Sequence, residues 1–344
     1  MYRFNSDYTE GCHPEILAKL VATNMEQTDG YGIDPYCGEA ADKIKAFFNC
    51  PDADVHFLVG GTQTNMTVIC AALRSHQAIY GTVDAHINTH ESGAIEHSGH
   101  KVIALPGTDG KLTAATVAYA YHAYCIDPSR EHLPRPKMVY ISQPTELGTI
   151  YTHKELTELY AFCKNSGLYL FIDGARLGYA LGSPANDLSP AALASLCDVF
   201  YIGGTKCGLL FGEAVVITNP LLQPDFRTIA KQNGALLAKG RLLGVQFAAA
   251  FTNNLYIKIC SRAVEQALQI RLALAAKNFD FLAQSSTNQQ FVLLSKEQYA
   301  KISENFHLSL IKYMDDGRIC ARICTSWATV QKDVEHLLNI IERL

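Results

Sequence analysis

The sequence lacks the features that mark membrane, secreted and nucleic-acid-binding proteins. No apolar run approaches the about 18 residues that a membrane helix requires, and residues 1–11 contain no apolar stretch of the kind found in a signal peptide. Lys and Arg are scattered, the formal net charge is −4, and no basic cluster could neutralise a phosphate backbone. We therefore expect a cytoplasmic protein whose partners include neither a membrane nor a nucleic acid.

Paired cysteine motifs are also missing. The 11 cysteines include no C-x-x-C pair, and the two closest, Cys320 and Cys324, are too far apart for a zinc ribbon or a disulfide framework. An odd number of cysteines is typical of reduced, mostly buried thiols in a reducing compartment. His90-Glu91 lacks a second histidine at position 94, so the zincin motif is absent. We expect no metal site.

The pattern of the central region is that of an α/β protein. The chain has 344 residues, of which 48% are hydrophobic and 18% charged, enough apolar material for a large and a small domain. From about residue 55 to 220, continuously apolar runs alternate with helical periodicity. Such runs are expected for strands covered on both faces, and they occur at 55–59, 137–143, 168–173, 198–203 and 214–218. The alternation predicts a doubly wound domain with a mainly parallel sheet.

The pattern changes after about residue 250. A long helical segment is followed by two short strands and an amphipathic helix, over 255–277, 290–294, 318–325 and about 334–341. This order predicts a smaller α+β domain. We divide the chain into an N-terminal segment that packs on the small domain or on a partner subunit, a large domain and a small domain, at 1–25, 26–250 and 251–344.

Two charged residues stand just past apolar runs of the large domain. Asp173 ends the run 168–173, and Lys206 follows the run that ends at Gly203. Ligands in open α/β sheets lie at the carboxyl ends of the strands. A carboxylate on the pyridine nitrogen and a lysine that forms a Schiff base are the two protein groups that pyridoxal 5′-phosphate needs. Each residue taken alone has a structural explanation as well. Asp173 could cap the turn after a strand, and Lys206 could be a solvated lysine on a loop.

A glycine turn and a histidine complete the candidate site. Gly60-Gly61-Thr62 joins a strand to a helix, where free N–H groups can bind a phosphate. The turn is neither a Walker loop nor a G-x-G-x-x-G fingerprint, and it also fits a plain connection. His86, in Asp84-Ala85-His86, offers a flat ring that can stack on a flat cofactor, although a structural histidine fits the same position.

In this order the motifs resemble the threonine aldolases, including their low-specificity L-threonine members, within the β-eliminating lyase group of fold type I pyridoxal-phosphate enzymes. The matching segments are N-S-D at 5–7, Y-G-I-D-P at 31–35, G-G-T at 60–62, D-A-H at 84–86, D-G-A-R at 173–176, Lys206 and R-I-C-T at 322–325. The resemblance covers residues 1 to about 250 closely and the rest thinly. It implies an aspartate-aminotransferase-like fold.

The resemblance implies roles for the residues around the cofactor ring. Lys206 is expected to hold pyridoxal 5′-phosphate covalently, Asp173 to pair with its ring nitrogen and His86 to stack on its ring. Arg176 is expected to lie beside the cofactor and to help position the substrate. Lys206, Asp173 and His86 form the expected catalytic set.

The resemblance also implies a phosphate site shared between subunits. Gly61 and Thr62 are expected to bind the phosphate, and Lys231 is expected to reach it from a neighbouring subunit. The family also has an arginine a little after this lysine. This sequence has no arginine at the matching position, and Lys239 or Arg241 could take its place. The resemblance therefore implies a homodimer or a homotetramer with shared active sites.

On the substrate side of the implied site, this sequence matches the family pattern at some positions and departs from it at others. Ser6 and Arg322 are expected to bind the substrate carboxylate, since the guanidinium fork matches a carboxylate. The family carries a second histidine after the strand at 137–141, facing the β-substituent, but residues 142–149 contain none. His90 stands where the family usually has an aromatic residue.

The implied reaction is the aldol cleavage of a β-hydroxy-L-amino acid, such as threonine or allo-threonine, to glycine and an aldehyde. His86, His90 and a bound water are the candidate bases for the β-hydroxyl proton. A β-eliminating lyase and an aminotransferase could use the same cofactor groups, and a catalytically silent binding protein could have the same fold.

Overall fold

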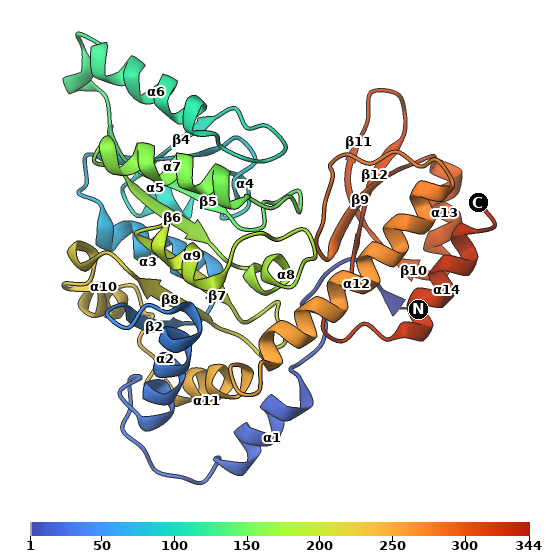
Figure 1. Ribbon diagram of the computed structural model, residues 1–344, viewed down its shortest axis with the longest axis horizontal. Coiled ribbons are helices and arrows are strands. Elements are labelled where there is room, and N and C mark those ends of the chain that lie inside the picture. The colour runs from blue at the N-terminus through green and yellow to red at the C-terminus, as the bar shows by residue number, and fades with distance from the viewer. Residues whose placement is uncertain (1) are drawn as a thin grey trace.

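A seven-stranded sheet forms the centre of the larger part of the chain, as Figure 1 shows for a computed structural model that describes residues 2–344. In spatial order the strands are β2 (Asp54–Leu58), β8 (Glu213–Ile217), β7 (Val199–Gly203), β6 (Tyr169–Asp173), β5 (Arg135–Ser142), β3 (Gln77–Thr82) and β4 (Lys101–Leu105). The pairs from β7 to β4 are parallel, and β8 runs antiparallel to both of its neighbours. The predicted doubly wound, mainly parallel sheet is confirmed.

Helices cover both faces of this sheet, because alternate strand residues point to opposite sides. Val139 and Ile141 of β5 join one apolar cluster, while Met138 and Tyr140 join the other. The first cluster is covered by α2 (Pro35–Phe48), α6 (Ala114–Ile126), α7 (His153–Asn165), α8 (Leu177–Leu181), α9 (Pro190–Ser195) and α11 (Arg241–Ala250). The second is covered by α3 (Gly61–Ala72), α4 (His86–Thr89), α5 (Ala94–His97) and α10 (Phe226–Gln232).

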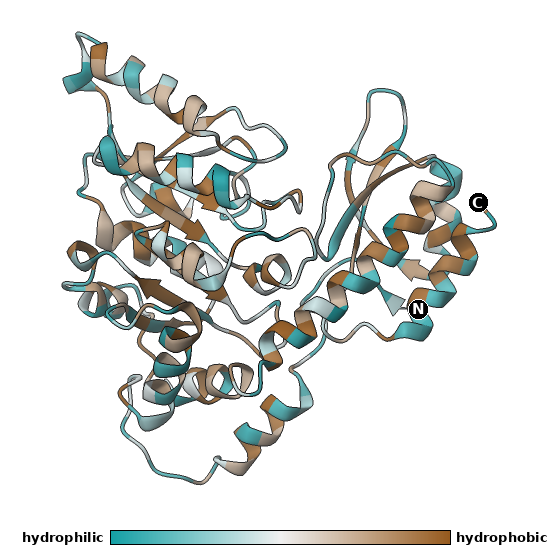
Figure 2. Cartoon of the chain, viewed as in Figure 1, coloured by the Kyte–Doolittle hydropathy of each residue, from teal (hydrophilic) through white to brown (hydrophobic). Residues whose placement is uncertain are grey.

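Local signals in the sequence set where these helices begin. Thr152 and Glu155 form a capping box at the start of α7, and Asp34 accepts a hydrogen bond from the Cys37 N–H at the start of α2. The apolar colouring of the central strands in Figure 2 reflects their burial between the two helical layers. Two single-turn 3₁₀ helices, η1 (Arg130–His132) and η2 (Pro220–Leu222), complete this region.

A second, smaller unit follows the long helix α12 (Leu255–Ala276). Its antiparallel sheet has the order β11 (Ser309–Tyr313), β12 (Ile319–Cys324) and β9 (Gln289–Leu294). The helices α13 (Lys296–Ser303) and α14 (Gln331–Ile341) complete it. Val334, Leu337 and Ile341 of α14 are fully buried in its core, as their helical spacing predicts. The expected α+β arrangement is therefore present after residue 250.

The N-terminal segment contacts both units. β1 (Tyr2–Arg3) pairs in parallel with β10 (Phe306–His307), and Phe4 is buried in the core of the smaller unit. The helix α1 (Pro14–Ala22) instead lies against α11, with Ile16 fully buried in the core of the larger unit. The chain between them, which includes Asp7, crosses from one unit to the other.

Neither a membrane-spanning helix nor a metal cluster is found within residues 2–344. No helix there is long and apolar enough to cross a bilayer. No group of three or more His, Cys, Asp or Glu side chains is placed to hold a metal ion. All eleven cysteines are free thiols.

A close backbone contact joins the ends of β6 and β7. The Gly203 N–H donates to the Gly174 carbonyl oxygen at 2.8 Å. A Cβ placed on Gly174 would stand 1.8 Å from the carbonyl oxygen of Tyr201, and one on Gly203 would stand 2.1 Å from that of Ala175. Only glycine fits at both positions, because the obstacles are backbone atoms that cannot rotate away.

We predict that Gly203→Ala lowers the free energy of unfolding by about 3 kcal/mol or more, because the added Cβ collides with the backbone and forces the ends of β6 and β7 apart. Urea denaturation measures the change. Gly38→Ala is the matched control: its Cβ meets nothing within 4 Å, and alanine in the first turn of α2 should raise stability by up to about 1 kcal/mol. Equal stabilities for the two variants would contradict the assigned contact.

Candidate active site

A cavity of about 380 Å³ lies beyond the carboxyl ends of β5, β6 and β7. This is the position at which open α/β sheets bind ligands. The structure brings six of the expected site residues together on its wall: Gly61, Thr62, His86, Asp173, Arg176 and Lys206.

Asp173 is a buried carboxylate with both oxygens engaged. Oδ2 accepts hydrogen bonds from Tyr140 Oη at 2.5 Å and Asn65 Nδ2 at 3.2 Å, and Oδ1 accepts from the Ala175 N–H at 2.9 Å. Burial alone raises the pKa of Asp173, but the charge of His86 and these hydrogen bonds outweigh burial and hold the pKa below its usual value. The surroundings of Asp173 therefore favour a negative charge at the end of β6.

A chain of side chains leads from Asp173 to His86. The Asn65 amide donates to Asp173 and also to Glu91 Oε1, at 2.7 Å, and the same Glu91 oxygen lies 2.7 Å from Nδ1 of His86. Asn65 and Glu91 are both buried. The orientation of the His86 ring is thus fixed relative to Asp173, while its other nitrogen makes no hydrogen bond within residues 2–344.

Lys206 lies on the loop between β7 and β8, and its backbone is anchored from two sides. Its carbonyl oxygen accepts from Tyr179 Oη at 2.6 Å. Glu213, at the start of β8, accepts from Thr205 Oγ1 at 3.0 Å and from the Gly204 N–H at 3.3 Å. Burial raises the pKa of Glu213 to about 8, against the opposing effects of Lys206 and Thr205. These hydrogen bonds fix the loop, while the Lys206 side chain forms no ion pair within residues 2–344.

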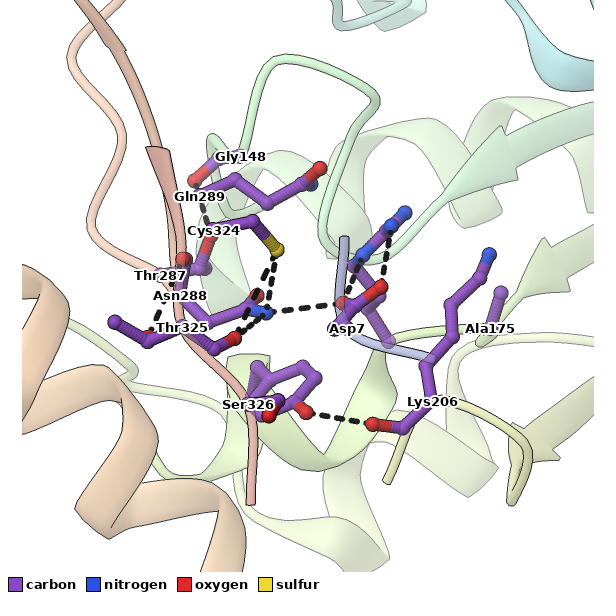
Figure 3. A network of polar contacts seen from close by, with 12 residues as sticks. Asp7, Gly148, Ala175, Lys206, Thr287, Asn288, Gln289, Cys324, Thr325 and Ser326 are labelled. Atoms are coloured by element: carbon purple, nitrogen blue, oxygen red, sulfur yellow. Dashed lines mark hydrogen bonds and ion pairs between the residues drawn. The ribbon is translucent and has the colours of Figure 1, made fainter. Parts of the chain in front are cut away.

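Arg176 is fixed by a residue from the N-terminal segment. Its Nε and Nη2 donate to the two oxygens of Asp7 at 2.7 and 2.9 Å, and Asn288 Nδ2 donates to Asp7 at 3.0 Å (Figure 3). Asn288 also donates to the Thr325 carbonyl oxygen at 2.9 Å. Burial alone raises the pKa of Asp7, but the charge and hydrogen bonds of the Arg176 guanidinium outweigh burial and hold the pKa below its usual value, which favours the ionised pair. This network links both units to the cavity.

The Gly60-Gly61 turn supplies free donors at the start of α3. Gly60 occupies the N-cap position without a side-chain capping bond, and the first N–H groups of a helix have no partner inside it. A Cβ on Gly61 would lie 3.2 Å from Tyr201 Oη, so glycine keeps the turn open at the cavity. These donors suit an anionic group.

Together these groups fit pyridoxal 5′-phosphate. The buried Asp173 carboxylate suits a ring nitrogen, the Gly60-Gly61 donors suit a phosphate, and the Lys206 amine suits an aldehyde carbon. His86 presents a flat ring on the same wall, within 5.6 Å of the stacked ring of His90.

Three expected site residues lie away from this wall. Ser6 and Arg322 are within the N-terminal segment and β12, where Arg322 Nη2 donates to the Asn5 carbonyl oxygen at 2.8 Å. Lys231 lies on α10, and its ammonium group stands 4.5 Å from the centre of the Tyr31 ring. The structure therefore does not bring these three residues to the cavity within one chain.

Sequence reasoning missed Tyr140, Asn65 and Glu91. Tyr140 precedes Ser142 on the same face of β5, and Ser142 is the register partner of Asp173, so strand alternation points Tyr140 toward that carboxylate. Asn65 lies one helical turn after Gly61, on the same face of α3. Glu91 carries no local signal, since only the fold brings it to Asn65.

Comparison with known proteins agrees with this site. A sequence model of the beta-eliminating lyase family matches residues 3–297. The low specificity L-threonine aldolase of Pseudomonas aeruginosa is 32% identical over 266 residues, or 76% of this chain and 75% of the relative. The enzyme of the same name from a Pseudomonas species is 30% identical over 343 residues, or 97% and 95% of the two chains.

Solved structures agree as well. A threonine aldolase of Leishmania major has a TM-score of 0.97 and 44% identity, and the match covers 100% of this chain and 99% of that one. An aspartate aminotransferase of Thermus thermophilus, at 13% identity and a TM-score of 0.72 over 100% and 91% of the two chains, shares the fold, so the aspartate-aminotransferase-like architecture is confirmed. The resemblance seen in the sequence is confirmed too: the chain belongs to the beta-eliminating lyase family, and within it to the group of the threonine aldolases.

Proposed function

We propose that this protein is a pyridoxal 5′-phosphate enzyme that cleaves the Cα–Cβ bond of a β-hydroxy-L-amino acid, such as threonine or allo-threonine, to glycine and an aldehyde. The observation that carries the proposal is the buried chain Asp173–Asn65–Glu91–His86 on the wall that also holds Lys206. The three threonine aldolases named above support the same reaction.

Each residue of the wall has a distinct task in this proposal. The cofactor, when bound, supplies an electron-withdrawing ring that accepts the electron pair left on Cα. Asp173 keeps a proton on the ring nitrogen, Lys206 binds the cofactor covalently, and His86 packs on the ring face. The free N–H groups at Gly61 and Thr62 bind the phosphate.

Two residues that do not line the cavity offer donors that suit the substrate carboxylate. Ser6 Oγ and Arg322 Nε are both buried without a hydrogen-bond partner among the described residues. Buried donors of this kind are costly unless a ligand satisfies them. Arg176, held rigidly by Asp7, presents a further cation on the cavity wall. We therefore assign carboxylate recognition to Ser6 and Arg322, with Arg176 positioning the substrate.

The surface of α1 and the following loop supports a homo-oligomer. Large apolar side chains are exposed there: Leu17 by 49%, Val21 by 69%, Met25 by 88% and Ile33 by 66%. Lys231 and Tyr31, which contact each other at the same end of the molecule, have no place in their own chain's cavity. We propose that a second copy covers this apolar surface and receives Lys231 at its phosphate site.

Products test the proposed reaction against its two enzymatic rivals. Incubation with threonine, allo-threonine or phenylserine should yield glycine and the corresponding aldehyde in equal amounts. Ammonia with a keto acid would identify a β-eliminating lyase, and amino-group transfer to a keto acid would identify an aminotransferase.

We predict that Lys206→Ala purifies folded but without covalently attached cofactor, because no other lysine of the described chain, residues 2–344, lines the cavity. Borohydride reduction of the wild-type protein should fix the cofactor to the peptide that contains Lys206, as read by mass spectrometry. A label on another lysine would show that the cofactor site is misplaced.

We predict that Asp173→Asn keeps the fold and some cofactor but loses at least about a hundredfold in kcat, equivalent to ~2.7 kcal/mol. Asparagine is nearly isosteric, yet it has no charge to keep the ring nitrogen protonated. Turnover and melting temperature are measured on one preparation. Early melting with near-normal turnover would instead make Asp173 a strand-end cap.

We predict that Met25→Glu shifts the protein toward the monomer in sedimentation and lowers its activity at low protein concentration, since a charge in an apolar interface is costly. Leu272→Glu is the control, because Leu272 is also exposed (69%) but lies on α12 away from α1. A wild-type protein that sediments as a fully active monomer would refute the shared site.

A further inference from the structure

Glu146 lies on the loop after β5, with one carboxylate oxygen fixed and the other facing the cavity. Oε1 accepts hydrogen bonds from Ser142 Oγ at 2.7 Å and from the His86 N–H at 3.0 Å. Oε2 makes no hydrogen bond within residues 2–344, yet it is absent from the buried atoms without a partner, so it is open to the cavity that Glu146 lines.

The other carboxylates of the cavity wall have both oxygens engaged. Asp173 accepts from Tyr140 and Asn65 on one oxygen and from the Ala175 N–H on the other. Glu213 accepts from Thr205 on one oxygen and from Gly204 on the other. Glu146 is thus the carboxylate of this wall that is prepared to accept a proton from a ligand.

The anchoring of Glu146 places it on the side of the cavity where His86 stands. Ser142 is the register partner of Asp173, so Ser142 fixes Glu146 to the strand ends that carry the cofactor site. The His86 N–H fixes the same oxygen from α4. Oε2 therefore has a set position relative to both His86 and Asp173, as a proton acceptor for a defined substrate atom requires.

We propose that Glu146 is the base that takes the proton of the substrate β-hydroxyl, an assignment that rests on the aldol cleavage proposed above. The hydroxyl proton passes to Glu146 Oε2, and the O–H bonding pair becomes the second bond of the aldehyde carbonyl. The Cα–Cβ bond breaks with its electron pair on Cα. One proton is then delivered to Cα to give glycine, so one proton leaves the substrate, one arrives, and no oxidant is needed.

The surroundings of Glu146 tune it for this task. Burial is the largest influence and raises the pKa of Glu146, and the nearby charge of Asp173 acts in the same direction, while the hydrogen bonds from Ser142 and the His86 N–H oppose them. The titratable groups that face it are His86, Asp173, Tyr140 and Tyr151. A carboxylate with a raised pKa is a stronger base than an exposed one.

The decisive variant is Glu146→Gln, which keeps an oxygen for Ser142 and the His86 N–H but removes the basic carboxylate. We expect kcat for aldehyde release from threonine and allo-threonine to fall by about a hundredfold to ten-thousandfold. The exchange of the glycine α-proton in D₂O, which involves no β-hydroxyl, should stay within about threefold of wild type. Glu158→Gln, on the exposed surface of α7, is the matched control and should change neither rate.

A second measurement reports on the protonation of Glu146 without using catalytic activity. In cofactor-free protein, the infrared difference spectrum of wild type minus Glu146→Gln should contain a protonated carboxyl band that persists above the pH at which exposed glutamates ionise. Its absence would overturn the proposal, because Glu146 would not be the shielded carboxylate that the structure places there.

The outcomes separate this proposal from the proposed reaction. A wild-type protein that forms no glycine from β-hydroxy amino acids overturns both. Normal wild-type cleavage with Glu146→Gln within a few-fold overturns the role of Glu146 alone. A parallel loss of cleavage and of glycine exchange makes Glu146 a structural support of His86 and also overturns its role as the base.

Discussion

The backbone contact between Gly174 and Gly203 is the constraint on which the rest of the site depends. It lets the ends of β6 and β7 approach until Gly203 donates directly to Gly174. Asp173 precedes one of these glycines and Lys206 follows the other, so their separation is set by main-chain geometry. Two opposite charges are thereby held at one cavity by a contact that contains no side chain.

Around this contact, neutral and charged side chains form a hydrogen-bond network that orients the site residues. Tyr140 and Asn65 orient Asp173, while Glu91 carries the same network to His86. Nearly all of these groups are buried and hydrogen-bonded, which is the condition under which polar side chains rigidify a site instead of destabilising the fold. Two of the buried atoms that have no partner among residues 2–344, Ser6 Oγ and Arg322 Nε, have a proposed ligand in the substrate carboxylate.

The sequence was sufficient to predict the strands that carry the site. The apolar runs ending near Ser142, Asp173 and Gly203 correspond to β5, β6 and β7, which are buried between two helical layers. β4 was not expected as a strand, since it is partly exposed and its pattern is weak. β3 was not expected either, although all of its residues are buried, because its run contains Gln77, Gly81 and Thr82 among the apolar residues. Asn288 and Glu146 also escaped prediction, because their roles depend on which distant side chains the fold brings to them.

The bond between Asp7 and Asn288 has a consequence for how the active site is assembled during synthesis. Asp7 leaves the ribosome long before its partners Arg176 and Asn288. The strand β1 likewise can pair only after β10, which follows Asn288 in the sequence, has been synthesised. Contacts of such large sequence separation form slowly, after long loops have closed. The large sheet can fold while the chain is still growing, but the hydrogen bond from Asn288 to Asp7, which helps to fix Arg176, forms only after residue 288 has been synthesised. The arginine to which we assign substrate positioning is therefore fixed in place later than the sheet that carries it.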